Sequence, residues 1–197
     1  MKKEAEPEEK KIVRDHMKRM RRNLSADCVM RFGAQISAEL LSMDEIRRAK
    51  TVFLYSAVRK EANPESFIRA LPALGKQMAY PRVCGDEMDF YVVQSTAELT
   101  PGAFGIPEPE PAAGLCRPTA GSVILVPGVA FMENGNRIGM GKGYYDRYLA
   151  RYPALLRIGI AYEAQLSAVW VPDEQDLPMD FIVTENRVIR CQSCERV

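Results

Sequence analysis

The first part of the chain places apolar residues at the spacing of an amphipathic helix. Between residues 10 and 24 these positions are Ile12, Val13, Met17, Met20 and Leu24, which share one helical face. Ser25 is a suitable N-cap for a second helix over 26–41. The inward positions of this second helix would be Val29, Phe32, Ile36 and Leu40. Residues 1–9 are charged and contain Pro7, so we expect a frayed tail there.

Beyond residue 50 the pattern changes to short apolar runs that are rich in β-forming residues. These runs predict strands over 51–55, 77–80, 88–93, 122–126, 156–162 and 181–184. A helix is predicted between them, with Asn63 as its cap, Pro64 as its first residue and Gly75 at its end. Its inward positions would be Phe67, Ile68, Leu71 and Leu74. Another helix is predicted over 142–152, and the proline-rich residues 101–118 should form an irregular loop.

Strands that alternate with helices are typical of an α/β protein. We expect three layers, α/β/α, around a mostly parallel sheet. One domain should span residues 10–190 and be followed by a tail over 191–197. In such sheets ligands bind beyond the carboxyl ends of the strands, which directs the search for a site to the loops that follow them.

Composition and charge narrow the class of protein. The net charge of +1 gives no general attraction to nucleic acid or membrane, and no apolar run reaches the roughly 20 residues that span a bilayer. We therefore expect a cytoplasmic monomer that binds a small molecule. Five cysteines are an odd number and do not indicate a disulfide framework. Cys191 and Cys194 form one CxxC pair, which we interpret as two thiols of the tail because zinc needs four ligands.

The most informative segment is a glycine-rich loop between the strand at 122–126 and the helix at 142–152. Gly139, Gly141 and Gly143 alternate along it, and glycine lets backbone N–H groups turn toward an anion. The helix that follows adds free N–H donors, while Arg137 and Lys142 add positive charge. The spacing matches neither the Walker pattern nor GxGxxG. Spacing alone fits a structural turn equally well, and the two cations favour a phosphate site.

Two carboxylates and a basic helix could complete such a site. Asp146 stands in the first turn of the helix after the loop and either offsets the helix dipole or binds Mg²⁺, with Asp180 as a second ligand. Residues 10–22 hold seven basic side chains and one acid, typical of a solvated helix face. Lys10 and Arg14, one turn apart, could instead reach a triphosphate. Tyr144 and Tyr145 could belong to the core, or one of them could stack on a ligand ring.

These motifs resemble those of the 5-formyltetrahydrofolate cyclo-ligase family, whose members are also called methenyltetrahydrofolate synthetases. The resemblance is most specific in the run Asn136-Arg137-Ile138-Gly139-Met140-Gly141-Lys142-Gly143-Tyr144-Tyr145-Asp146. It continues in Lys10-Lys11-x-x-Arg14, in Phe53-Leu54-Tyr55 followed by Glu61, in Tyr80-Pro81-Arg82, in Met88-Asp89-Phe90, in 105–109 and in 176–185. The matching segments span nearly the whole chain in the family's order.

The resemblance implies an ATP- and Mg²⁺-dependent ring closure of 5-formyltetrahydrofolate to 5,10-methenyltetrahydrofolate. It assigns ATP binding to Lys10, Lys11, Arg14, Arg137, Gly139, Met140, Gly141, Lys142, Gly143, Tyr144 and Tyr145. Among these, it implies catalytic roles for Arg137, Lys142 and Tyr145. The reduced folate would contact Ser56, Glu61, Phe104 and Tyr144, and Mg²⁺ would bind Asp146 and Asp180.

The chain departs from the family's usual residues at Met140, Asn63, Pro64 and Ser56. An ATP-using paralogue with another small substrate therefore stays open as an alternative. A binding module that contacts RNA through the basic helix is a second alternative. The near-neutral charge and the lack of a stacked-aromatic RNA motif speak against it.

Overall fold

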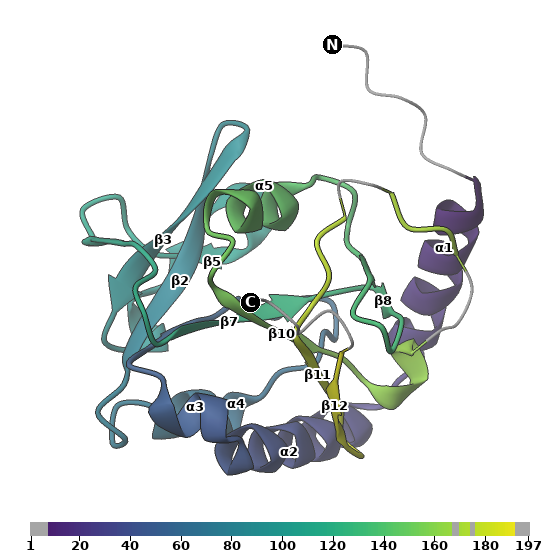
Figure 1. The fold of residues 1–197 in the computed structure, drawn as a ribbon, viewed down its shortest axis with the longest axis horizontal. Coiled ribbons are helices and arrows are strands. Elements are labelled where there is room, and N and C mark those ends of the chain that lie inside the picture. The colour runs from purple at the N-terminus through teal and green to yellow at the C-terminus, as the bar shows by residue number, and fades with distance from the viewer. Residues whose placement is uncertain (1–7, 167–169, 174–175, 192–197) are drawn as a thin grey trace.

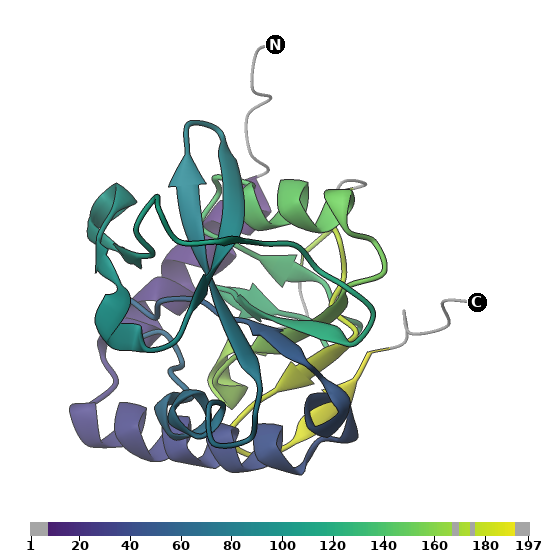
Figure 2. The same cartoon turned by 90° about the vertical axis from the view of Figure 1, so that its left-hand side faces the viewer.

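A twisted eight-stranded sheet runs through the middle of the protein (Figures 1 and 2). The computed structural model describes residues 8–166, 170–173 and 176–191. In sheet order the strands are β12 (Val188–Arg190), β11 (Phe181–Val183), β10 (Leu156–Ile160), β7 (Ser122–Pro127), β1 (Thr51–Phe53), β2 (Gln77–Cys84), β3 (Glu87–Val93) and β6 (Leu115–Cys116). The five strands from β11 to β2 are parallel, and β12, β3 and β6 are antiparallel edge elements. The predicted mostly parallel sheet is confirmed.

Helices cover both faces of this sheet. Figure 1 shows α2, α3 and α4 on one face, α5 on the other, and α1 at the side of the sheet next to β8 (Ala130–Phe131). Their bounds are α1 Glu8–Arg22, α2 Ala26–Ser42, α3 Asp44–Arg48, α4 Glu65–Ala70 and α5 Tyr144–Arg151. Short 3-10 turns are η1 (Thr96–Glu98), η2 (Ala103–Gly105) and η3 (Glu163–Gln165). The three-layer α/β/α architecture predicted from the alternation of elements is therefore present.

Side chains of the central strands alternate between two cores. Val52 and Leu54 pack under α2 and α4, whereas Phe53 points to the α5 side. The same alternation sends Val123 and Leu125 to the first core and Ile124 and Val126 to the second. A strand buried on both faces must be apolar at every position, which explains the continuous apolar runs in the sequence.

The direction in which strands are added to the sheet reverses between two loops. β1 lies between β2 and β7, and the chain adds β2 on one side of β1 and then β7, β10 and β11 on the other. The loops that follow β1 and β7 therefore leave neighbouring strand ends in opposite directions. Ligands of doubly wound sheets bind at this switch point. The first loop carries Ser56 and Glu61, and the second leads to the glycine loop.

The structure corrects several helix predictions. Ser25 caps α2 by accepting a hydrogen bond from the N–H of Cys28, as predicted. The first helix, however, begins at Glu8, inside the segment predicted as a frayed tail, and Ile12 is 61% exposed. The buried face of α1 includes Lys10, Arg14 and Arg21 beside Met17, because these cations have partners inside the protein.

The fourth helix is shorter than the sequence suggested. It begins at Glu65 with Pro64 as its N-cap, so the predicted cap at Asn63 was wrong by one residue. Asn63 instead uses its carbonyl oxygen to accept the N–H of Glu65. The helix ends at Ala70, and the turns that follow reach Gly75, which adopts a positive φ. Leu74, predicted to face inward, is 52% exposed.

Two strand regions also differ from the prediction. Residues 101–118 are not wholly irregular, because β6 pairs with the edge strand β3, and β4 (Thr100–Pro101) pairs with β5 (Pro107–Glu108). The strand β12 was not predicted, and it places Cys191 in the core at 1% exposure, so this thiol is not part of a surface tail. Cys194 lies outside the described residues.

Candidate active site

A β-hairpin connects β7 to the glycine loop. It consists of β8 (Ala130–Phe131) and β9 (Arg137–Ile138), and the N–H of Val129 donates to the carbonyl oxygen of Ile138 at 2.7 Å. Gly141 and Gly143 have φ values of 88° and 68°, the left-handed region that favours glycine. Gly143 is the N-cap of α5 and offers no side chain to cap it. The start of α5 therefore keeps its donors available, as an anion site requires.

Arg137 connects this hairpin to the first turn of α5. Its buried guanidinium donates from Nη1 to the carbonyl oxygen of Pro127 at 3.2 Å and from Nη2 to Asp146 Oδ1 at 2.7 Å. It also lies over the ring of Tyr145, 5.7 Å from the centroid. Within the part of the chain that the structure describes, its Nε is buried without a hydrogen-bond partner. A fixed cation at the helix start suits the neutralisation of phosphate charge.

Arg14 reaches the same loop from α1. Its Nε donates to the carbonyl oxygen of Gly139 at 2.9 Å, and its guanidinium is near the position that a Cβ on Gly141 would take, 4.0 Å from Nη2. Arg14 and Arg137 come from segments more than a hundred residues apart in the chain. The structure thus brings together two of the cations that the sequence placed in a phosphate site.

Lys142 and Phe104 lie at the outer side of the loop. Both are exposed, and the Nζ of Lys142 is 5.7 Å from the centroid of the Phe104 ring. Phe104 adopts a positive φ of 58°, unusual for an aromatic residue. Ser56 is close in the fold to this region, since its hydroxyl donates to the carbonyl oxygen of Pro107 at 2.6 Å. The structure thus brings Lys142, Phe104 and, through Pro107, Ser56 into one region beside the glycine loop.

Glu61 lies in the loop after β1, and only a small part of its side chain is exposed. One of its oxygens accepts the N–H of Val58 at 3.1 Å, and the other lies 3.5 Å from Nη1 of Arg21. Burial raises the pKa of Glu61, and the opposing effects of Arg21 and of the Val58 N–H only partly offset it. The loop is tight: Arg59 and Lys60 both have positive φ, 52° and 58°. Non-glycine residues adopt this conformation at a cost, which is commonly seen at binding sites.

Three tyrosines lie within electrostatic reach of Glu61. Burial raises the pKa of Tyr55 and of Tyr145 well above the ordinary value, and the charge of Glu61 adds to both shifts. Burial likewise raises the pKa of Tyr162 to about 12, although Arg21 opposes this. All three hydroxyls thus stay protonated at neutral pH and can act as hydrogen-bond donors. Tyr144 points away, donating to the carbonyl oxygen of Gly85 at 3.3 Å.

A cationic cavity of about 690 Å³ opens between α1, the loop after β1 and the glycine loop. Its lining residues are Asp15, Lys18, Arg19, Arg21, Arg22, Arg59, Lys60 and Met140. Six of these are cations and one is an acid, so the cavity attracts negatively charged groups. Met140 connects this cavity to the glycine loop and is 43% exposed.

Lys10 and Lys11 are not at the glycine loop in this structure. Lys10 is buried, and its Nζ forms ion pairs with Asp173 and with Asp176, each at 2.6 Å. Lys11 is exposed, and its Nζ is 3.9 Å from Glu8. A phosphate role for Lys10 would require it to exchange these two carboxylates for phosphate oxygens.

The two predicted Mg²⁺ ligands have different surroundings. Asp146 binds Arg137 at the start of α5 and is partly exposed. Asp180 is 2% exposed at the start of β11, where its Oδ2 accepts the N–H of Arg157 at 2.8 Å. Asp180 precedes β11, whereas Asp146 follows the loop that leaves the end of β7. Because these strands are parallel, all their starts lie on one side of the sheet and all their ends on the other. Asp180 is therefore on the opposite side from Asp146. Among the described residues, no three acidic, histidine or cysteine side chains form a metal-binding group.

Sequence reasoning did not single out several residues that the structure places here. Arg21 was one of seven basic side chains of the first helix, and only its burial against Glu61 distinguishes it. Arg147 donates to the carbonyl oxygens of Lys142 and Asp86 and so holds the end of the glycine loop. Neither residue belongs to a local motif, so only the folded chain could identify them.

A family model described as the 5-formyltetrahydrofolate cyclo-ligase family matches residues 6–185. A probable 5-formyltetrahydrofolate cyclo-ligase of Schizosaccharomyces pombe is 33% identical over 172 residues, covering 79% of this chain and 84% of the relative. The 5-formyltetrahydrofolate cyclo-ligase of Escherichia coli K12 is 26% identical, covering 87% and 98%.

Solved structures agree with these relatives. The 5,10-methenyltetrahydrofolate synthetase of Aquifex aeolicus superimposes with a TM-score of 0.81 at 36% identity, covering 95% of both chains. The 5,10-methenyltetrahydrofolate synthetase of Mycoplasma pneumoniae gives a TM-score of 0.73 at 25% identity, covering 89% of this chain and 98% of that one. Similarity in sequence and in fold thus points to the same family over nearly the full length.

Proposed function

Because this chain belongs to the 5-formyltetrahydrofolate cyclo-ligase family, we propose that it closes 5-formyltetrahydrofolate to 5,10-methenyltetrahydrofolate with ATP and Mg²⁺, releasing ADP and phosphate. One observation carries this proposal: Arg14 and Arg137 converge on the glycine loop at the start of α5. The proposed anion site and the carboxylate of Glu61 are near one another, since the charge of Glu61 acts on Tyr145 in the first turn of α5.

ATP supplies the phosphoryl group that turns the formyl oxygen into a good leaving group, after which nitrogen 10 attacks the activated carbon and phosphate leaves. The residues of the chain then need mainly to position the two substrates and to neutralise the charge of the phosphates. We assign phosphate binding to Arg14, Arg137 and Lys142 with the backbone of the loop 139–143. We assign to Tyr145, whose hydroxyl stays protonated, the donation of a hydrogen bond to the reacting oxygen.

Mg²⁺ prefers oxygen ligands and usually keeps several waters beside one or two carboxylates. Asp146 suits this role, since it is partly exposed at the start of α5 beside the glycine loop. Asp180 accepts the Arg157 N–H at the starts of the parallel strands, so in this arrangement it is too far from Asp146 to share one ion with it. We therefore propose Asp146 as the principal ligand, and the variants Asp146→Asn and Asp180→Asn test the two carboxylates separately.

For the folate, the structure offers two complementary regions. The carboxylate of Glu61 can accept two N–H groups of the pterin together, as carboxylates do from arginine. The cationic cavity beside it suits the carboxylates at the other end of a reduced folate. Ser56 and Phe104 complete the proposed folate contacts, and Tyr144 would join them only if its hydroxyl left the carbonyl oxygen of Gly85. Lys142 lies beside Phe104, so the nucleotide and the folate would meet at this side of the loop.

The deciding experiment is an assay of methenyl absorbance with 5-formyltetrahydrofolate, with and without ATP. We expect product only when ATP and Mg²⁺ are both present, and a strong rise in the apparent ATP constant for Lys142→Ala. Losing a charge-assisted contact typically weakens binding by about tenfold or more. Folded wild-type protein that forms no methenyl product would overturn the proposal. Product made without ATP would contradict the phosphoryl step.

We further propose that the enzyme acts as a cytoplasmic monomer without nucleic-acid or membrane partners. No helix among the described residues is long and apolar enough to cross a bilayer. Sedimentation of the purified protein with and without RNA tests the monomer and the absence of nucleic acid together. A stable dimer, or a complex with RNA at physiological salt, would contradict this part.

A further inference from the structure

Gln165 makes three hydrogen bonds from a buried amide. It lies in η3, directly after β10, and is 2% exposed. Its Nε2 donates to the carbonyl oxygens of Gly128 at 3.0 Å and of Val129 at 2.9 Å, while its Oε1 accepts the N–H of Tyr162 at 3.0 Å. Two acceptors on one side and one donor on the other fix the orientation of the amide.

The two carbonyl groups belong to the base of the hairpin that carries Arg137. Gly128 follows β7, and a Cβ at this position would lie 2.4 Å from the ring of Phe131 and 3.1 Å from Cγ of Arg137. The backbone here is therefore tightly packed against Arg137, which itself donates to the carbonyl oxygen of Pro127. A change in the position of this peptide would move Arg137 and the glycine loop after it.

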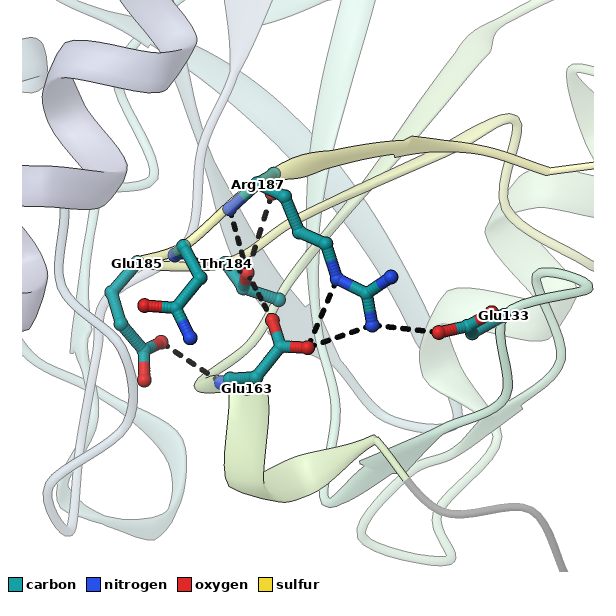
Figure 3. Close-up of polar contacts among 6 residues, drawn as sticks. Glu133, Glu163, Thr184, Glu185 and Arg187 are labelled. Atoms are coloured by element: carbon teal, nitrogen blue, oxygen red, sulfur yellow. Dashed lines mark hydrogen bonds and ion pairs between the residues drawn. The ribbon is translucent and has the colours of Figure 1, made fainter.

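The turn of the same hairpin is attached to η3 as well. Figure 3 shows Arg187 between Glu133 and Glu163, with the hydroxyl of Thr184 donating to Glu163. The Nη2 of Arg187 is 2.6 Å from Glu133 and 2.7 Å from Glu163. These groups are partly exposed, and surface ion pairs contribute little. The buried amide of Gln165 is the stronger attachment, because leaving two buried carbonyl groups without donors is costly.

We propose that Gln165 is a positioning residue, which holds the glycine-loop hairpin against the end of β10 and so sets where Arg137 and the loop meet the phosphates. The part that concerns phosphates rests on the proposed function. The positional part stands on the hydrogen bonds alone. Gln165 itself touches no reacting group in this assignment and acts through the hairpin.

Two substitutions test it against a matched control. Gln165→Glu keeps the shape and an acceptor but loses both amide donors, whereas Gln165→Met removes every polar atom. The control is Ile36→Val, a fully buried change in the core under α2, which lowers stability modestly without touching the hairpin. All are compared well below their unfolding temperatures, by hydrogen exchange of residues 129–143 and by calorimetry with a non-hydrolysable ATP analogue.

We expect the backbone amide hydrogens of residues 129–143 to exchange about tenfold faster in both Gln165 variants than in Ile36→Val. Both variants should also bind the analogue about tenfold more weakly than Ile36→Val does. For Gln165→Glu alone, lowering the pH should recover part of the affinity, because the protonated carboxyl can again donate to one carbonyl group. Variants whose loop exchange and affinity equal those of Ile36→Val overturn the inference. Wild-type protein that does not bind the analogue would refute the proposed nucleotide site, while the exchange data still decide whether Gln165 holds the hairpin.

Discussion

Arg14 donates a hydrogen bond from Nε to the carbonyl oxygen of Gly139, 2.9 Å away, and thereby joins the first helix to the glycine loop. The bond uses one edge of the guanidinium. Nη2 lies on the Gly141 side of the loop. A lysine cannot do both, since its ammonium is a point charge on a flexible stem, whereas the guanidinium is a rigid fork.

Arg14→Lys should therefore weaken nucleotide binding while keeping the charge of α1 unchanged. We expect a loss of about 1.5–3 kcal/mol, or tenfold or more in the ATP constant, with a smaller effect on folate binding. Calorimetry with a non-hydrolysable analogue measures it. Arg48→Lys, at an exposed position on α3, is the matched control and should bind like the wild type. An Arg14→Lys protein with unchanged affinity would show that the Gly139 contact is only structural.

Asp146→Asn and Asp180→Asn should separate a metal ligand from a structural carboxylate. Asp146→Asn should lower activity, and extra Mg²⁺ should restore part of it, because amide oxygens are weaker ligands for hard cations. If the contacts of Asp180 are structural, Asp180→Asn should chiefly lower the unfolding temperature, since a neutral amide oxygen accepts the buried N–H of Arg157 less strongly than the carboxylate does. Activity measured across a Mg²⁺ titration decides between them. Recovery of Asp180→Asn by Mg²⁺ would make it a second ligand, and full activity in excess EDTA would exclude the metal.

Lys10 gives a third prediction. The family resemblance assigns it to the phosphates of ATP, whereas in the structure its ammonium group is paired with two carboxylates. If Lys10 exchanges Asp173 and Asp176 for the nucleotide, the substitution Asp173→Asn should strengthen ATP binding by a few-fold, as the competing pair is weakened. Asp173 is the more exposed acid, so its loss should disturb the fold less. Titration of each variant with the analogue tests this. Weaker binding would indicate that the acids instead hold Lys10 in its working position.

Much of the fold could be predicted because its central strands are buried on both faces. Such strands read as continuous apolar runs, and strands over 51–55 and 122–126 were predicted on that basis. The structure has β7 over Ser122–Pro127 and a shorter β1 over Thr51–Phe53. The edge strands β6 and β12 escaped prediction, since two or three residues carry no pattern of their own. Their pairing depends on the neighbour strands that the folded chain supplies.

The residues of the candidate site also fall into two groups: those that a local motif reveals and those that only the folded chain brings together. The glycine loop and Arg137 form one continuous motif that the sequence shows directly, and Arg14 contacts this loop from another segment. Their role in phosphate binding stays a prediction. Gln165 was missed, because its partners at Gly128 and Val129 lie in another segment and no local pattern links them. The apolar spacing also missed part of the buried face of α1. Arg14 and Arg21 are buried there because they contact polar partners inside the protein, which a hydrophobic pattern does not reveal.

Glu61 yields a prediction that depends on pH. Burial raises its pKa, with Arg21 and the Val58 N–H opposing, so the folded protein holds this proton more tightly than the unfolded chain does. Folding is then favoured by protonation, and the wild type should lose stability relative to Glu61→Gln as the pH rises from the unfolded pKa through the higher folded pKa. Binding has the opposite requirement, because only the ionised carboxylate accepts two N–H groups of a pterin. Folate affinity of the wild type should therefore increase over the same pH range, and Glu61→Gln should bind weakly at every pH while keeping its ATP affinity.

Thermal unfolding and folate titrations of both proteins across this range, with the ATP analogue as reference, measure the two trends. Equal folate affinity in the two proteins would remove Glu61 from the folate site, and equal affinity together with a divergence in stability would leave it a buried structural acid paired with Arg21.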